Sequence, residues 1–102
     1  MKLNVMERII TLNLLPAEGS FANIKLLRVA REALSFDDLE NKKLQFVQNG
    51  DTLNWKLDAD VGEKEITLGE IVTQMIVKEL KKLDDEEKLT EQHFSLFEKF
   101  MT

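Results

Sequence analysis

The sequence predicts a single helix-rich α+β domain with about four to five helices and one antiparallel β-hairpin, in the order α-α-α-β-β-α-α. Three observations predict this fold class. Apolar residues recur at helical spacing in segments that begin with capping residues. An Asn49-Gly50 pair separates two segments with alternating apolar residues, as in a hairpin. The chain has 102 residues, 43% of them apolar, so we expect residues 1–102 to form one globular domain around one core.

The first predicted element, residues 5–15, is apolar on nearly every side. Asn4 and Glu7 have the spacing of a capping box, which favours a helix. The alternation over residues 10–14 also fits a strand, which stays the alternative to the helix that the cap favours. Its only polar stripe consists of Glu7, Arg8 and Thr11. A helix with so little polar surface is expected deep in the core.

Two further helices are predicted before the hairpin. Residues 16–19 form a turn, and Ser20 then caps a helix that ends near Leu34. Ser35 begins another capping pattern, which predicts a short third helix that ends near residue 43. The apolar positions of the second helix are Ile24, Leu26, Leu27, Val29, Ala30, Ala33 and Leu34.

The hairpin is the clearest local prediction, with strands at residues 44–48 and 51–57. Asn49-Gly50 suits a two-residue type I′ turn because both residues tolerate positive φ. That turn sets a register in which the large apolar side chains share one face. These side chains are Leu44, Phe46, Leu53 and Trp55. We expect them to hold the hairpin against two helices: the first, at residues 5–15, and the fourth, which directly follows the hairpin.

Two helices follow the hairpin. Residues 64–66 predict a short extended segment, and Thr67 with Glu70 has the spacing of a capping box. This box opens the best-defined helix of the chain. The apolar face of that helix comprises Leu68, Ile71, Val72, Met75, Ile76, Leu80 and Leu83. Thr90 caps a final helix.

The composition removes most catalytic constellations. The chain has no cysteine and no tyrosine, and its one histidine, His93, is expected to be an ordinary half-buried residue of the final helix. Residues 58–62 resemble the start of a calcium loop, but Glu63 and Gly69 occupy the positions where that pattern requires glycine and glutamate. We therefore expect no enzyme activity, no catalytic residue, no metal and no cofactor.

The chain is expected to be cytoplasmic and to make no membrane contact. No stretch approaches the roughly 20 apolar residues of a membrane span, and no apolar run of signal-peptide shape follows residue 1. The lack of cysteine fits a reducing compartment.

The order of three helices and a hairpin also suggests a winged-helix DNA-binding protein. The basic residues that favour this alternative are Lys25, Arg28, Arg31, Lys42 and Lys43. The net charge of −5 opposes it, as do three acids in the third helix, the one that would enter the DNA groove. Those acids are Asp37, Asp38 and Glu40.

The C-terminal helix offers a candidate contact surface for a protein partner or a second copy of the chain. Its residues are Phe94, Phe97, Phe100 and Met101. Core packing competes with this role for Phe97 and Phe100, whereas Phe94 points about 60° away from the nearer of these two, Phe97, on a helix.

Several segments together resemble small phage and prophage proteins of unassigned function. These segments are residues 7–8, 15–19, 28–36, 80–84 and 88–91. The resemblance covers most of the chain and implies no activity, cofactor or catalytic residue. It favours a small non-enzymatic acidic protein that acts through protein–protein contact as a phage or prophage accessory or structural protein. The alternative is the winged-helix-like DNA-binding regulator.

Overall fold

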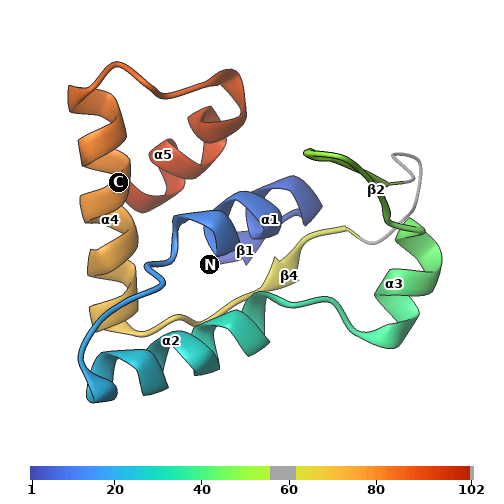
Figure 1. Cartoon of the computed structure of the whole chain (residues 1–102), viewed down its shortest axis with the longest axis horizontal. Coiled ribbons are helices and arrows are strands. Elements are labelled where there is room, and N and C mark those ends of the chain that lie inside the picture. Colours follow the sequence, from blue (N-terminus) through green and yellow to red (C-terminus); the bar gives the residue numbers. More distant parts are fainter. Residues whose placement is uncertain (56–61, 102) are drawn as a thin grey trace.

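A computed structural model describes residues 1–55 and 62–101 (Figure 1). The elements in chain order are β1 (Lys2–Leu3), α1 (Val5–Leu14), α2 (Phe21–Leu34), α3 (Asp38–Leu44), β2 (Val47–Asn49), β3 (Thr52–Asn54), β4 (Lys64–Glu65), α4 (Glu70–Asp85), the 3₁₀ turn η1 (Glu91–His93) and α5 (Phe94–Met101). The predicted α+β class and the predicted order of helices and hairpin are confirmed.

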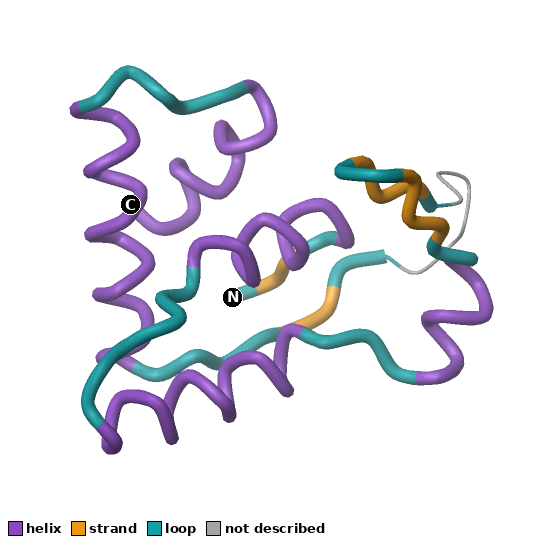
Figure 2. The backbone as a smooth tube through the Cα atoms, in the orientation of Figure 1, coloured by secondary structure: helices purple, strands orange, loops and turns teal. Residues whose placement is uncertain are grey.

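Helix α1 lies at the centre of the helical packing, with α2 on one side and α5 on the other (Figure 2). The predicted cap is present: the Asn4 side chain accepts a hydrogen bond from the Glu7 amide at 2.8 Å, and the Asn4 amide donates to Glu7 Oε1 at 2.9 Å. The helix prediction for this segment is therefore confirmed. The core around it comprises Leu3, Ile10, Leu14, Leu15, Leu27, Ala30, Leu34, Ile66, Val72, Ile76, Leu80, Leu96 and Phe100.

Helix α2 begins at its predicted cap, where the Ser20 hydroxyl accepts from the Asn23 amide at 3.2 Å. Its buried residues are Leu27, Ala30 and Leu34. In the neighbouring apolar row, Leu26 is 39% exposed and Val29 is 65% exposed, whereas Ala33 packs partly against the core.

Two predicted caps are wrong. Helix α3 is capped by Asp37, whose carboxylate accepts from the Glu40 amide at 2.8 Å, whereas the Ser35 hydroxyl donates back to Arg31 O of α2 at 2.6 Å. Helix α4 begins after Gly69, with no side-chain cap, rather than after Thr67. The chain is held extended through Ile66, whose amide donates to Met1 O at 2.8 Å, so the helix starts later than the sequence suggests.

A short antiparallel pair of strands joins β1 to β4, with Lys2 opposite Glu65 and Leu3 opposite Lys64. The extended segment at residues 64–66 agrees with the prediction, whereas strand β1 has no sequence signal of its own. Leu3 of β1 and Ile66, the residue directly after β4, are both buried in the core.

The hairpin forms, but its register differs from the prediction. Asn49 pairs with Thr52, so the turn consists of Gly50 and Asp51 rather than Asn49-Gly50. Gly50 has a φ of +60° and Asp51 has no positive φ, so glycine alone takes the conformation that other residues avoid, as in a type II′ turn. Helix α3 also extends through Leu44, because Gln45 adopts the left-handed conformation that ends it.

The hairpin lies beside only one of the two helices predicted to hold it. It stands next to α3, at the side of the molecule opposite α4, and its Phe46 and Leu53 line a pocket together with residues of α1 (Figure 1). Leu44 is buried, whereas Phe46, Leu53 and Trp55 are half-buried. The second strand of the prediction continues past residue 55 into residues 56 and 57, which lie outside the described part of the chain.

The molecule therefore has two regions. We call α1, α2, α4, α5 and the β1–β4 pair the helical core, and residues 37–55, which comprise α3 and the β2–β3 hairpin, the arm. The connector of Ser35 and Phe36 joins α2 of the core to the arm.

Candidate functional site

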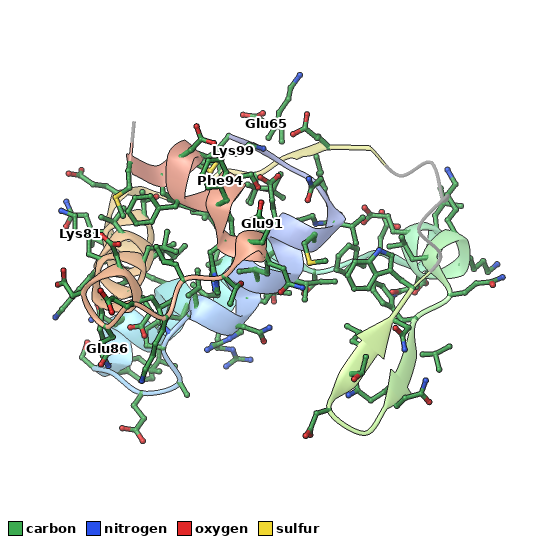
Figure 3. All side chains as sticks on the ribbon, turned by 90° about the horizontal axis from the view of Figure 1, so that it is seen from above. Glu65, Lys81, Glu86, Glu91, Phe94 and Lys99 are labelled. Carbon is green, nitrogen blue, oxygen red and sulfur yellow. The ribbon has the colours of Figure 1, made fainter. Side chains whose placement is uncertain are left out.

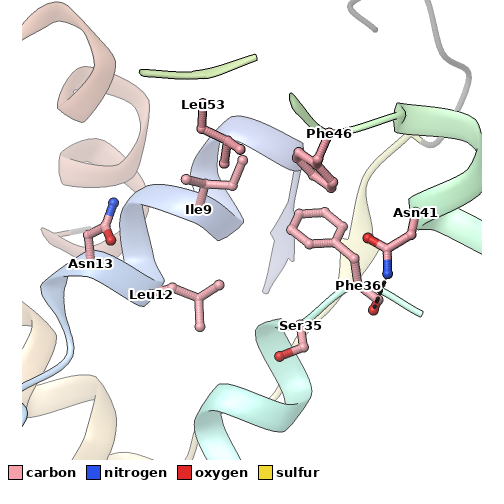
Figure 4. A pocket seen from close by; sticks show the side chains of 8 residues that line it. All are labelled: Ile9, Leu12, Asn13, Ser35, Phe36, Asn41, Phe46 and Leu53. Atoms are coloured by element: carbon pink, nitrogen blue, oxygen red, sulfur yellow. Dashed lines mark hydrogen bonds between the residues drawn. The ribbon is translucent and has the colours of Figure 1, made fainter. Parts of the chain in front are cut away.

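A pocket of about 340 Å³ lies where the arm meets α1 (Figure 4). Its lining residues are Ile9, Leu12, Asn13, Ser35, Phe36, Asn41, Phe46 and Leu53. They come from α1, the connector, α3 and the hairpin, so both regions of the molecule contribute a wall.

The pocket is apolar with a neutral polar margin. Helix α1 presents Ile9, Leu12 and Asn13 at spacings of three and four residues, which places them on one helix face. Three side chains supply the polar groups, namely Asn13, Ser35 and Asn41, and each carries an amide or a hydroxyl. No lining residue of this pocket carries a formal charge. Such a lining suits an apolar group that is attached to an uncharged hydrogen-bonding group.

Arg8 fixes the connector and α3 against α1, although only 1% of its surface is exposed. Its Nε donates to Leu34 O at 3.2 Å, and its Nη2 donates to Ser35 O. The Nη1 atom donates to Glu40 Oε2 at 2.6 Å and Nη2 donates to Glu40 Oε1 at 3.3 Å, so Arg8 and Glu40 form a bidentate ion pair. A buried guanidinium is tolerated only when its donors are satisfied, as they are here.

Aromatic rings continue this contact into the hairpin. The Arg8 guanidinium lies 4.0 Å from the centroid of the Phe36 ring. Phe36 and Phe46 pack edge to face with centroids 5.1 Å apart, and Phe46 and Trp55 are 6.1 Å apart. These are favourable separations for cation–π and aromatic pairs. The hairpin wall of the pocket is thus positioned by a row of contacts that begins at Arg8.

The carboxyl group of Glu40 is held ionised by this arrangement. Its hydrogen bond from Arg8 lowers its pKa, and partial burial raises the pKa by less. The Asp37 amide donates to the same carboxylate at 3.1 Å and lowers the pKa further. The capping box of α3 and the ion pair to α1 therefore share one side chain.

A second buried carboxylate, Glu7, ties α1 to α5. Lys99 Nζ donates to Glu7 Oε1 at 2.8 Å, to Glu63 Oε2 at 3.0 Å and to Lys2 O at 2.7 Å. Burial raises the pKa of Glu7, but the Asn4 amide, Lys99 and the Ser95 hydroxyl outweigh burial and lower it. Burial likewise lowers the pKa of Lys99, and its two carboxylate partners raise it overall.

The C-terminal residues predicted as a contact surface divide between core and surface. Phe100 is 8% exposed and belongs to the core, and Phe97 and Met101 pack partly against it. Phe94 is 63% exposed, and it lies on α5 together with Lys99 (Figure 3). None of the four lines the pocket, so their role in binding a partner stays a prediction.

The basic residues of the DNA-binding alternative are mostly exposed. Lys25 and Arg28 lie on α2, and Lys42 and Lys43 lie on α3. Arg31 is half-buried and donates to Pro16 O at 2.9 Å, which fixes the turn before α2. Two exposed acids, the cap Asp37 and Asp38, stand at the start of α3, so negative charge lies at one end of this helix and the two lysines lie at the other.

His93 has a local structural role. Its Nδ1 accepts a hydrogen bond from the Thr90 amide at 3.0 Å, which closes the 3₁₀ turn before α5. Within residues 1–55 and 62–101, no cluster of three or more histidines and acids is arranged to hold a metal ion. The calcium-loop start at residues 58–62 falls almost wholly on residues outside that range. No helix in the same ranges has both the length and the apolar character of a membrane span.

Comparison of the chain with family models, with curated proteins and with solved structures finds no match. Its function must therefore be inferred from its own residues. The pocket residues escaped the sequence analysis, because they come from four segments whose contacts depend on the fold. One signal was present: Arg8, the only basic residue of a mostly apolar helix.

Proposed function

We propose that this chain is a small non-enzymatic protein that acts through contact with a partner protein, and that the pocket beside α1 takes up an apolar side chain of that partner. The observation that carries the proposal is the lining of this pocket, which is apolar with a neutral polar margin and no charged residue.

The size of the pocket supports a side chain rather than a large ligand. Ligand sites range from about 300 to 1,000 Å³, and a volume of 340 Å³ stands at the low end of that range. Amide and hydroxyl groups can both donate and accept hydrogen bonds, as a peptide backbone requires. Asn13 and Asn41 would therefore meet the backbone beside the inserted side chain, and Phe46 and Leu53 would meet the side chain itself.

The wider setting is part of the same proposal. The resemblance to small phage and prophage proteins supports an accessory or structural role, and the cysteine-free composition suits a cytoplasmic protein. DNA binding is less favoured, because the exposed lysines of α3 lie in one short helix whose cap and first residue are exposed acids.

A selection of peptides from a random display library, followed by titration into the labelled protein, tests the proposal. We expect selected peptides to share one bulky apolar residue and to shift the NMR signals of Ile9 and Phe46. Leu53→Glu places a charge in the pocket and should weaken binding at least ~10-fold.

The matched control is Val47→Glu, which introduces the same charge on the same hairpin. Val47 is 52% exposed and alternates to the opposite face of the hairpin from Leu53. We expect this variant to bind the selected peptides as the unchanged protein does, with circular dichroism confirming that both variants are folded. Binding that survives Leu53→Glu, or that both variants lose equally, would contradict the pocket as the site.

A further inference from the structure

Helix α2 carries a second apolar feature on its outer side. Its residues follow one another at spacings of four, three and four, which is the repeat by which helices pair. We call these residues the α2 seam: Ala22, Leu26, Val29 and Ala33. Val29 is 65% exposed and Leu26 is 39% exposed, so the larger side chains of the seam are open to a partner.

One edge of the seam is charged and the other is neutral. Lys25 and Glu32 flank it on one edge, seven residues apart, and both are exposed. The opposite edge carries Asn23, which is half-buried, and Ala30, which is buried in the core, so this edge of the seam adjoins the helical core. The ion pairs found among the described residues involve neither Lys25 nor Glu32. Lys25 lies over the Phe21 ring, 5.5 Å from its centroid, so the same edge carries one positive and one negative side chain, neither of them in an ion pair with another described residue.

We propose that the α2 seam pairs with the α2 seam of a second copy of this chain, antiparallel and about a two-fold axis. In that arrangement Leu26 lies opposite Val29 of the second copy, and Ala22 lies opposite Ala33 of the second copy. The two charged edges then face each other, so Lys25 meets Glu32 of the second copy, and symmetry repeats the pair. Opposite charges at these flanking positions specify orientation in paired helices.

A parallel pair would not satisfy the same charges. It sets the charged edge of one helix against the neutral edge of the other, so Lys25 would face Ala30 of the second copy. Only the antiparallel arrangement gives both charged residues an oppositely charged partner. The antiparallel arrangement also matches large side chains with large ones at the centre and alanine with alanine at the ends.

The dimer should be weak and reversible. Helix α2 has 14 residues and the seam only four, so the contact falls below the roughly 1,200 Å² of total area that stable complexes bury. Phe21, which is 80% exposed at the start of α2, adds apolar surface beside the seam. The seam shares no residue with the pocket, so the two sites are separable by mutation.

Sedimentation equilibrium from about 10 µM to about 1 mM tests the proposal. The unchanged protein should approach twice its 11.8 kDa mass at the highest concentration. Lys25→Glu and Glu32→Lys should each weaken the dimer ~10-fold or more, because like charges then meet. The double variant Lys25→Glu/Glu32→Lys should restore the dimer to within ~3-fold of the unchanged protein.

Lys81→Glu is the matched control, since it makes the same charge change on the exposed surface of α4 and should leave the dimer unchanged. A monomer at every concentration would overturn the proposal. So would a dimer that ignores the charge exchanges, or a double variant that stays monomeric while its circular dichroism shows a folded chain.

The absence of cysteine permits a direct test of orientation. Leu26→Cys and Val29→Cys proteins, mixed and oxidised, should form a disulfide mainly between the two different variants. Preferential joining of two Leu26→Cys copies would indicate a parallel pair and overturn the antiparallel arrangement.

Discussion

The helical core and the arm are built on different principles. In the core, Leu27, Ile76, Leu80 and Leu96 are each 0% exposed, and the helices hold one another through these apolar contacts. In the arm, every residue of β2 is exposed and β3 has one half-buried residue, Leu53. Leu44 is the one buried residue of the arm, and the other contacts that hold the arm are polar and aromatic and converge on Arg8. The comparison teaches that a short segment with a single buried apolar residue can be positioned by one buried cation in a neighbouring helix.

The largest effect is expected from Arg8→Met, which keeps the length of the side chain but removes its donors. Glu40 and two backbone carbonyls then lose their partner, so unfolding free energy should fall by about 3–5 kcal/mol. Urea denaturation followed by circular dichroism measures the loss. Arg28→Met, on the exposed surface of α2, is the matched control and should leave the midpoint unchanged. Equal midpoints for the two variants would break the distinction between core and arm.

A matched pair of leucines sharpens the comparison. Leu80→Ala removes a fully buried side chain of the core and should cost about 2–5 kcal/mol. Leu53→Ala removes a half-buried side chain of the arm and should cost about 1 kcal/mol. Both values come from urea denaturation under the same conditions. A Leu53→Ala cost as large as that of Leu80→Ala would show that the arm has a core of its own.

Trp55 gives an intermediate effect. The hairpin pattern predicts that Trp55 is fully buried. In that case Trp55→Ala would lower the free energy of unfolding by about 3–5 kcal/mol. The structure leaves Trp55 half-buried at the end of the aromatic row, so we expect a cost of about 1–2 kcal/mol by thermal denaturation. A loss in the higher range would place this side chain in a buried core.

Acid should loosen the arm with the smallest effect of this series. The folded state lowers the pKa of Glu40. The ionised carboxylate therefore stabilises the folded protein above the usual glutamate range, about pH 4 to 5, and this stabilisation is lost as the pH falls through the pKa of Glu40 in the folded state. Glu40→Gln should make the acid-dependent loss of stability smaller by about 1 kcal/mol. Trp55 is the only tryptophan, so its fluorescence reports this change from the arm. Glu18→Gln, the exposed control, should keep the acid dependence of the unchanged protein.

Local signals predicted the helices because their caps are made by residues near in sequence. Asn4 with Glu7 and Ser20 with Asn23 form the hydrogen bonds that their spacing suggests. The same reasoning failed at Thr67, because pairing between β1 and β4 keeps the chain extended there. Strand β1 has only two residues, too few for a periodic pattern, so it could not be predicted alone.

The pocket was beyond sequence reasoning for a related reason. Arg8 contacts Leu34 and Glu40, 26 and 32 residues away, and nothing in the spacing singles out these partners. The hairpin register shifted because Gly50 with Asp51 made the turn in place of Asn49 with Gly50. Phe46 and Leu53 still share a face, and they line the pocket beside α1, one of the two helices predicted to hold the hairpin. The other, α4, lies on the opposite side of the molecule (Figure 1).

Amide hydrogen exchange under native conditions tests most directly whether the arm is held separately from the core. We predict that the amides of β2 and β3 exchange through local opening with a free energy about 2–4 kcal/mol below that of the most protected amides of α4. In the Arg8→Met protein the hairpin should lose its protection while α4 remains the most protected element. Hairpin amides that exchange as slowly as those of α4, in either protein, would contradict the account.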